Sequence, residues 1–244
     1  MLRYLVYPSF LAALVVAGCA GEAPVLGDDD PSPDAGDNTD APEVAPIRVS
    51  GKSLDYFTLQ PLATVQLSTE GMAPELTGAS DAQGNYALDN VPVGSVFYVS
   101  AVRDVYRPTR NTLVRVADAS VMTDLLLVSV LDARRQYASL NLTPTAGQAV
   151  LFADLRRNNG MPLEGVPLAD IQLLDAANAP VGKGPFFFGQ AGDVVSNATL
   201  AVSTAFNGRA RVAFLDVPPG NYTLKVANPP DGGGGGGGFA TLRV

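Results

Sequence analysis

The chemistry open to this chain is limited by the residue types that it lacks. Its 244 residues include no His and a single Cys, Cys19. Imidazole is required in Ser-His-Asp triads, in Cys-His dyads and in the usual zinc sites, so the sequence excludes these kinds of site. No pair of carboxylates has a spacing that indicates acid–base catalysis, and an enzyme would have to use carboxylates or Ser and Lys alone. The sequence therefore predicts a non-enzymatic protein without a metal or other cofactor.

Cys19 is the residue whose surroundings indicate a specific reaction. An apolar run spans residues 4–16 after Arg3 and is broken only by Pro8 and Ser9, and two small residues then lead to the cysteine. This order is typical of an export signal. A thiolate is nucleophilic enough at neutral pH to accept a lipid as a thioether. We therefore expect a signal over residues 1–18 and a modified Cys19 at the start of the mature chain.

The four residues Val16-Ala17-Gly18-Cys19 resemble the lipobox of bacterial lipoproteins at every position. The resemblance implies a diacylglyceryl group on the sulfur and a further acyl chain, such as palmitate, on the new amino group. Two or more chains make membrane anchoring stable. Ala20 follows the cysteine, and in that family the absence of Asp there implies transfer to the outer membrane. An ordinary signal peptide with an incidental Cys and an uncleaved anchor are the alternatives.

An acidic segment follows the cysteine. Residues 20–46 contain eight Asp and Glu, no Lys or Arg and no aromatic residue, so they cannot bury enough apolar surface to offset the entropy of ordering. We expect a disordered tether over residues 19–46, between roughly 30 Å long as a coil and roughly 80 Å as extended polyproline. Calcium binding by the Asp run at 28–30 is an alternative, although no D-x-D-x-D-G loop with a distal Glu is present.

The formal net charge of −8 belongs to this tether, because the rest of the mature chain is nearly neutral. No region of the chain has the excess of basic residues that neutralisation of phosphates needs. Nucleic acid is therefore not an expected partner.

From residue 47 onward, short runs alternate apolar and polar residues at the period of two that is typical of strands. Turn residues separate these runs at intervals typical of a β-sandwich. The clearest runs are residues 47–49, 63–67, 86–88, 96–99 and 113–116. Residues 125–142 instead place apolar residues at a period of 3.6 and are followed by Pro144, which predicts a helix at about 130–141.

The second half of the chain repeats the first. Residues 61–67 (PLATVQL) recur as residues 167–173 (PLADIQL) with five identities. The motif N-V-P-x-G at residues 90–94 returns as D-V-P-x-G at residues 216–220. The spacing indicates an insertion of about 20 residues in the second copy, mostly within 175–203. Two copies of one domain are therefore expected.

The repeated motifs resemble those of the carboxypeptidase regulatory-like, or transthyretin-like, β-sandwich domain. N-G-M-P-L-E-G-V at residues 159–166 matches the opening of that family, whereas the first copy lacks the Gly-Val after its Pro-Leu turn. The resemblance implies an all-β protein with two tandem Ig-like sandwiches, at 47–128 and 146–244, joined by a helical connector over 129–145. Domains of this kind are usually non-catalytic spacers or recognition modules, so the resemblance says little about function.

Two groups of residues are candidates for ligand binding. Phe186, Phe187 and Phe188 lie in the insertion, and three consecutive rings cannot all face one side of a strand. An outward ring could stack on a sugar, but core packing by an additional strand is the simpler explanation. The second group, Tyr98, Arg103 and Tyr106, lies in an arginine-rich region that could hold phosphate or carboxylate groups or form a solvated strand face.

These expectations combine into one functional hypothesis. The sequence predicts a lipid-anchored protein of the cell envelope, in the outer membrane, with a structural or protein-interaction role. The lipid on Cys19 is expected to attach the protein to the membrane, and other envelope proteins or glycans are further candidate partners. Binding of carbohydrate or another envelope polymer is the alternative function.

Overall fold

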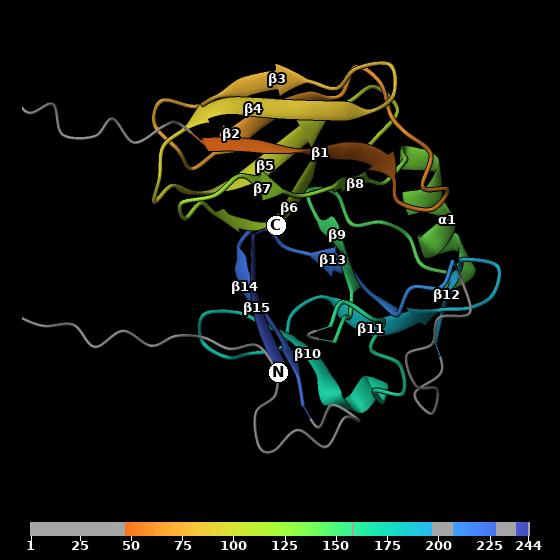
Figure 1. Ribbon diagram of the computed structural model, residues 1–244. Coiled ribbons are helices and arrows are strands. Elements are labelled where there is room, and N and C mark those ends of the chain that lie inside the picture. Colours follow the sequence, from red (N-terminus) through yellow and green to blue (C-terminus); the bar gives the residue numbers. More distant parts are fainter. Residues whose placement is uncertain (1–46, 158, 197–206, 228–237, 244) are drawn as a thin grey trace, which may run out of the picture. The chain divides into compact units, whose positions relative to one another are not determined.

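The structure is a computed structural model that describes residues 47–157, 159–196, 207–227 and 238–243. These residues belong to one compact unit of the chain. The predicted signal, Cys19 and the predicted tether lie outside the described residues. Within the described part, strands dominate and the single α-helix has ten residues, so the prediction of an all-β protein is confirmed (Figure 1).

Two sheets built from residues 47–127 face each other as the N-terminal sandwich. In the first sheet, β1 lies between β4 and a pair of short strands, β7 and β8, which run parallel to it. In the second sheet the order is β3-β2-β5-β6. Side chains that alternate along β5 meet those of β1 and β4 in a shared core. The strands are β1 (Ile47–Asp55), β2 (Gln66–Glu70), β3 (Thr77–Ala79), β4 (Asn85–Val91), β5 (Val96–Val102), β6 (Thr109–Arg115), β7 (Val121–Met122) and β8 (Leu125–Leu127).

The described residues from 149 onward form a C-terminal sandwich with its own core. One sheet has the order β12-β11-β13-β9, and the other has the order β10-β14-β15 after a short 3-10 helix, η1. Phe214 of β13 and Ile171 of β10 meet in the core between the two sheets. The elements are β9 (Ala149–Asp154), η1 (Leu168–Asp170), β10 (Ile171–Leu174), β11 (Lys183–Phe188), β12 (Val194–Val195), β13 (Arg211–Val217), β14 (Asn221–Val226) and β15 (Gly238–Arg243).

The same pairing pattern occurs in both sandwiches, as the internal repeat predicts. The antiparallel pair β1–β4 corresponds to β9–β13, and the order β2-β5-β6 corresponds to β10-β14-β15. A shift in strand register accompanies the V-P-x-G motif in each copy, where Asn90 and Asp216 adopt φ values of 62° and 50°. Asn and Asp tolerate this left-handed conformation better than other side chains do. The repeated motif therefore encodes a repeated β-bulge.

Helix α1 (Val130–Ser139) lies between the two sandwiches in the sequence, close to the predicted range of 130–141. Its first turn is capped by Ser129, whose hydroxyl accepts a hydrogen bond from the amide of Asp132 at 2.9 Å. Ser is among the preferred residues at this position because its oxygen satisfies an amide that has no partner in the helix. The helix buries Ala133, Gln136 and Tyr137.

Substitution of Gly51 should reveal how closely β1 and the β7 segment approach each other. A Cβ atom at this position would lie 2.0 Å from the carbonyl oxygen of Thr123, which is a backbone atom. We expect Gly51→Ala to lower the free energy of unfolding by about 1–3 kcal/mol, because the strand has to move. Gly189→Ala is the matched control, since its Cβ would meet Val195 at an ordinary 3.6 Å. Equal urea-unfolding midpoints for the two variants would contradict the expectation.

Candidate functional site

Asp55, the last residue of β1, shapes the turn that carries Tyr56 and Phe57. Its carboxylate accepts hydrogen bonds from the amides of Phe57 and Thr58 at 2.9 and 2.8 Å. The same side chain accepts the hydroxyl proton of Tyr106 at 3.0 Å. An Asp that bonds to the backbone two residues later fixes the direction of a turn. The turn that Asp55 fixes at the end of β1 therefore directs Tyr56 and Phe57 away from the N-terminal sandwich.

Tyr56 and Phe57 pack against two aromatic residues of the C-terminal sandwich, Phe152 and Phe188. The rings of Tyr56 and Phe152 are stacked with their centroids 5.1 Å apart. Phe57 lies 5.9 Å from Phe152 and 6.0 Å from Phe188. Aromatic pairs of this kind contribute about 0.5–1.5 kcal/mol beyond the burial of their area. We call these four residues the aromatic junction.

Arg211 of β13 is completely buried against the aromatic junction. Its guanidinium carbon lies 4.2 Å from the centroid of the Tyr56 ring, and its Nη2 donates to the carbonyl oxygen of Tyr56 at 2.9 Å. Burial lowers the pKa of Arg211 from its ordinary value, and the negative charge of Asp154, 3.3 Å from Nε, opposes this shift. A buried charge needs such partners, so Arg211 ties the turn at Tyr56 to β13.

Asp154, at the end of β9, supplies the negative charge of this cluster. It forms ion pairs with Arg209 and Arg211, and Arg156 approaches it to 3.9 Å. The hydroxyl of Tyr56 donates to its Oδ1 at 3.4 Å. Burial first, and then the charge of Asp154, raise the pKa of Tyr56 above its ordinary value. The phenol therefore stays protonated and acts as a donor at physiological pH.

Helix α1 forms a second connection to the C-terminal sandwich. The buried side chain of Gln136 accepts a hydrogen bond from the amide of Val194 at 2.8 Å and donates one to the carbonyl oxygen of Gly192 at 3.2 Å. Arg135 forms an ion pair with Asp193 in the same hairpin. The connecting helix is thus bonded to the sandwich that follows it.

The three phenylalanines of the insertion are placed on both faces of β11. Phe187 points into the core of the C-terminal sandwich, whereas Phe188 belongs to the aromatic junction and Phe186 packs beside it. Phe187 and Phe188 are only 6% and 1% exposed, in agreement with core packing by an additional strand, whereas Phe186 is half-buried. Tyr56 and Phe57 cover the outward face of β11. This contact could not be predicted from the sequence of the insertion alone.

The second group of candidate ligand-binding residues, Tyr98, Arg103 and Tyr106, does not form one site. Tyr98 is half-buried in the middle of β5, whereas Arg103 lies in the turn after that strand. The guanidinium of Arg103 lies 5.1 Å from the ring centroid of Tyr106, whose hydroxyl is bound to Asp55. Arg103 and Tyr106 therefore belong together, and Tyr98 belongs to a different surface.

That surface is the outer face of the β3-β2-β5-β6 sheet. Tyr98 pairs across the sheet with Glu70 on one side and Leu113 on the other. Glu70 accepts the hydroxyl proton of Ser100 at 2.9 Å and forms an ion pair with Arg110. An aromatic ring thus lies beside a connected row of polar side chains, whose carboxylate comes from β2, outside the arginine-rich region that the sequence indicated.

A further polar cluster surrounds Asp216 at the bulge of the second copy. Its carboxylate accepts hydrogen bonds from the hydroxyl of Tyr137 at 2.8 Å and from the amide and hydroxyl of Thr145 at 3.1 and 3.0 Å. Lys183 approaches it to 2.6 Å. Burial alone would raise the pKa of Asp216, but these donors outweigh it and lower the pKa from 3.8 to about 2. The cluster ties the segment after α1 to the sheet.

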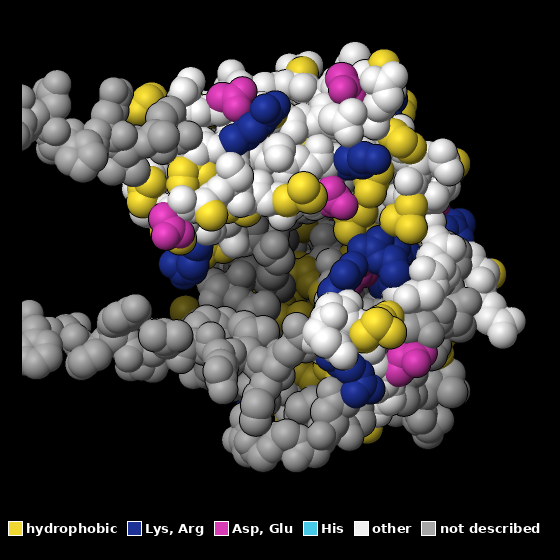
Figure 2. Space-filling view, viewed as in Figure 1, with side chains coloured by type: hydrophobic (Ala, Val, Ile, Leu, Met, Phe, Trp, Pro, Cys, Tyr) yellow, Lys and Arg dark blue, Asp and Glu magenta, His cyan; other side chains and the backbone are white. Residues whose placement is uncertain are grey.

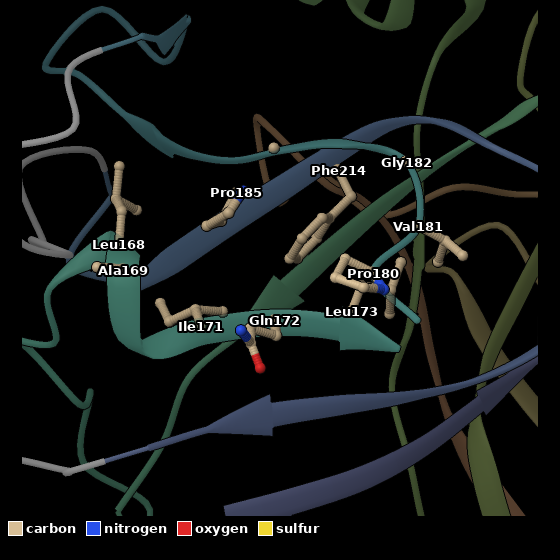
Figure 3. A pocket seen from close by; sticks show the side chains of 11 residues that line it. Leu168, Ala169, Ile171, Gln172, Leu173, Pro180, Val181, Gly182, Pro185 and Phe214 are labelled. Carbon is tan, nitrogen blue, oxygen red and sulfur yellow. The ribbon is translucent and has the colours of Figure 1, made fainter. Parts of the chain in front are cut away.

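A cavity of about 230 Å³ lies in the C-terminal sandwich between β10 and β11. Figure 3 shows Phe214, Pro185 and Ile171 around it, and the residues that line it are mostly apolar. Gln172 contributes the one polar side chain among the residues that line this cavity. Among residues 47–157, 159–196, 207–227 and 238–243, no cluster of His, Cys, Asp or Glu is arranged to hold a metal ion. In the same described ranges no helix has the length and apolar character needed to cross a membrane.

Comparison with known proteins gives matches at the level of solved structures. No protein-family model and no curated protein matches the chain. The Bacillus anthracis TIE protein matches 82% of the chain over 31% of its own length, with 14% identity and a TM-score of 0.31. A Bacteroides uniformis protein with a proposed role in carbohydrate binding matches 82% of the chain over its full length, with 12% identity and a TM-score of 0.31. The shaft pilin SpaA of Lactobacillus rhamnosus GG matches 82% of the chain over 94% of its own length, with 15% identity and a TM-score of 0.29.

Removal of the buried guanidinium should destabilise the protein strongly. We expect Arg211→Met to lower the free energy of unfolding by about 3–5 kcal/mol, because it leaves Asp154 with less compensation and Tyr56 without its donor. Arg115→Met, at an exposed position of β6, should stay within about 0.5 kcal/mol of the unchanged protein in the same urea titration. A cost for Arg211→Met no larger than that of this control would show that the buried charge does not hold the junction.

Stability at acid pH should depend on Asp216. Its pKa is lowered from 3.8 to about 2, so the stability that its ionised form contributes is complete above about pH 5 and is lost as the pH falls towards 2. We expect the melting temperatures of the unchanged protein and of Asp216→Asn to differ at pH 6 and to converge near pH 2. Asn also adopts positive φ, so the bulge is kept. A gap between the two melting temperatures that stays constant from pH 6 to pH 2 would refute the assignment.

Proposed function

We propose that this protein is a membrane-anchored lipoprotein of the cell envelope with a non-catalytic, structural or protein-interaction role. In this proposal Cys19 carries the lipid, the acidic segment 19–46 is the tether, and two transthyretin-like sandwiches form the displayed part. The lipobox resemblance supports an anchor in the outer membrane, and the duplicated strand pairing supports two copies of one module.

The observation that carries the structural role is the contact between the two sandwiches. Tyr56 and Phe57 of the N-terminal sandwich are buried among Phe152 and Phe188 of the C-terminal sandwich, and Arg211 is buried with them. Modules joined by an exposed linker usually move relative to each other, whereas a large apolar contact restricts that motion. Arg211 adds a hydrogen bond and a ring contact to Tyr56, which link the two sandwiches directly. The pair of sandwiches is therefore suited to act as a stiff spacer or display platform.

The anchor is tested by substitution of Cys19 in the full chain expressed in a bacterium that processes lipoproteins. The unchanged protein should incorporate labelled palmitate and sediment with membranes, because its sulfur and its new amino group carry acyl chains. Cys19→Ala should lose the label and most of the membrane fraction, whereas Ala20→Ser should keep both. If Cys19→Ala matures and fractionates like the unchanged protein, the anchor hypothesis is wrong.

Binding of an envelope polymer is a second candidate function, and the outer face of the β3-β2-β5-β6 sheet is the observation that favours it. Tyr98 there offers a half-buried ring beside the polar row of Glu70, Ser100 and Arg110. Rings that are fixed on a sheet can stack on the apolar face of a sugar, while neighbouring carboxylate and guanidinium groups bind its hydroxyls.

This second candidate is tested on a glycan array with the full chain carrying Cys19→Ala, so that lipid does not contribute. If the face binds a sugar, Tyr98→Ala should weaken the signal by about tenfold, as expected for a lost stacking contact. Met161→Ala removes an exposed side chain of the C-terminal sandwich and should leave the signal unchanged. An empty array, or equal signals from both variants, would exclude the face as a glycan site.

A further inference from the structure

Two strongly exposed apolar side chains lie on adjoining segments, the turn after β5 and the start of α1. Val105, in the turn after β5, is 76% exposed, and Leu131, in the first turn of α1, is 77% exposed. The amide of Val130 donates to the carbonyl oxygen of Val105 at 2.9 Å, which holds the turn beside the helix. Single exposed apolar residues are ordinary, but two on adjoining segments form a patch. We call it the Val105–Leu131 patch.

The backbone at Val105 is strained. Its φ of 60° lies in the left-handed region, which a β-branched residue rarely adopts. The turn is held by the bond to Val130 and by a hydrogen bond from the amide of Tyr106 to the carbonyl oxygen of Arg103 at 3.2 Å. The hydroxyl of Tyr106 is in turn bound to Asp55. Backbone strain that the surrounding structure maintains is often found at binding sites. Here the strained backbone holds the side chain of Val105 in the solvent.

Arginines surround the patch. Arg103 lies over the ring of Tyr106, and Arg107 is exposed one residue further along the chain. Arg134 is exposed and follows Leu131 by three residues, so it lies on the same side of α1. On the face shown in Figure 2, Lys and Arg side chains gather with hydrophobic ones on the side where α1 lies in Figure 1.

Among the charged side chains that solvent reaches around the patch, basic ones outnumber acidic ones. Asp132 of α1 forms an ion pair with Arg135 and accepts a hydrogen bond from the hydroxyl of Ser129. Asp55 is buried and accepts three hydrogen bonds. Asp104 is exposed in the turn and offsets one of the three surrounding arginines. An apolar centre with a basic rim is therefore complementary to a surface that is negatively charged outside and apolar beneath.

We infer that the Val105–Leu131 patch docks on the headgroup region of an anionic lipid bilayer. Two apolar side chains are too few for a specific protein interface, which usually buries more than about 1,000 Å² in total. They suffice for shallow insertion at a membrane interface when basic side chains bind the anionic headgroups. Arginine binds phosphate in a bidentate manner and is less strongly hydrated than lysine, which suits it to this contact.

Such a contact is weak on its own and depends on being held near the surface. A second binding event on a tether is intramolecular and takes place at an effective concentration in the millimolar range. That amplification rests on the proposed anchor at Cys19, whereas the contact of the patch with lipid does not. The folded part would then touch the membrane at a point far along the chain from its anchor.

The test uses the full chain with Cys19→Ala, so that its outcome is independent of lipidation. Binding is measured by flotation with vesicles of equal parts phosphatidylglycerol and phosphatidylethanolamine, and with vesicles of phosphatidylcholine alone. We expect binding to the anionic vesicles, little binding to the neutral ones, and a loss of binding as salt screens the charges. Each of Arg103→Gln and Arg134→Gln should weaken binding by about fivefold.

Apolar variants complete the test. The double substitution Val105→Ser and Leu131→Ser should weaken binding to anionic vesicles by at least about tenfold, because both inserted side chains are lost. Met122→Ser is the matched control, since Met122 is 84% exposed on β7, away from the patch. Equal losses in the control and the double variant, equal binding to both vesicle types, or no binding at all would overturn the proposal. Capture of an envelope protein by a crosslinker at residue 105, without vesicle binding, would identify a protein interface instead. If the double variant does not fold, the arginine variants decide the question.

Discussion

The arrangement of this protein depends on one buried cation. Arg211 lies beneath the ring of Tyr56, binds the carbonyl oxygen of that residue and is neutralised by Asp154. Because a guanidinium in an apolar environment is stable only with such partners, separation of the turn after β1 from β13 would break its hydrogen bond and ring contact and expose the aromatic rings. The aromatic junction and the bonds from α1 add to this constraint, and the sandwiches are thereby held together at several points.

Much of the fold follows from local patterns. Alternation along residues 96–99 predicts a strand that lies within β5, and the repeated V-P-x-G motif predicts the matching pairs β1–β4 and β9–β13. The helix at Val130–Ser139 follows from a change of period and from Pro144, which stops the pattern. These features depend on neighbours in the sequence, so a single chain is enough to reveal them.

The junction could not be predicted in the same way, because its members are far apart in the sequence. The run Phe186–Phe188 indicates only that at least one ring faces away from the core of the C-terminal sandwich. The residues that cover that ring come from the turn at 56–57. One signal was available: residues 212–215 of β13 are apolar without alternation, which is typical of a strand covered on both faces. The arginine at its start then becomes a candidate for burial. The outer face around Tyr98 was recognised only in part, because Glu70 reaches it from β2, a strand that is distant in the sequence.

The central claim is that the two sandwiches form one stiff unit. Spin labels on Val93→Cys and Met161→Cys, both exposed, would report the distance between the sandwiches in the chain carrying Cys19→Ala. The account predicts one narrow distance distribution, which broadens when Arg211→Met is added because the buried charge no longer fixes the junction. A broad distribution already present with Arg211 in place would contradict it.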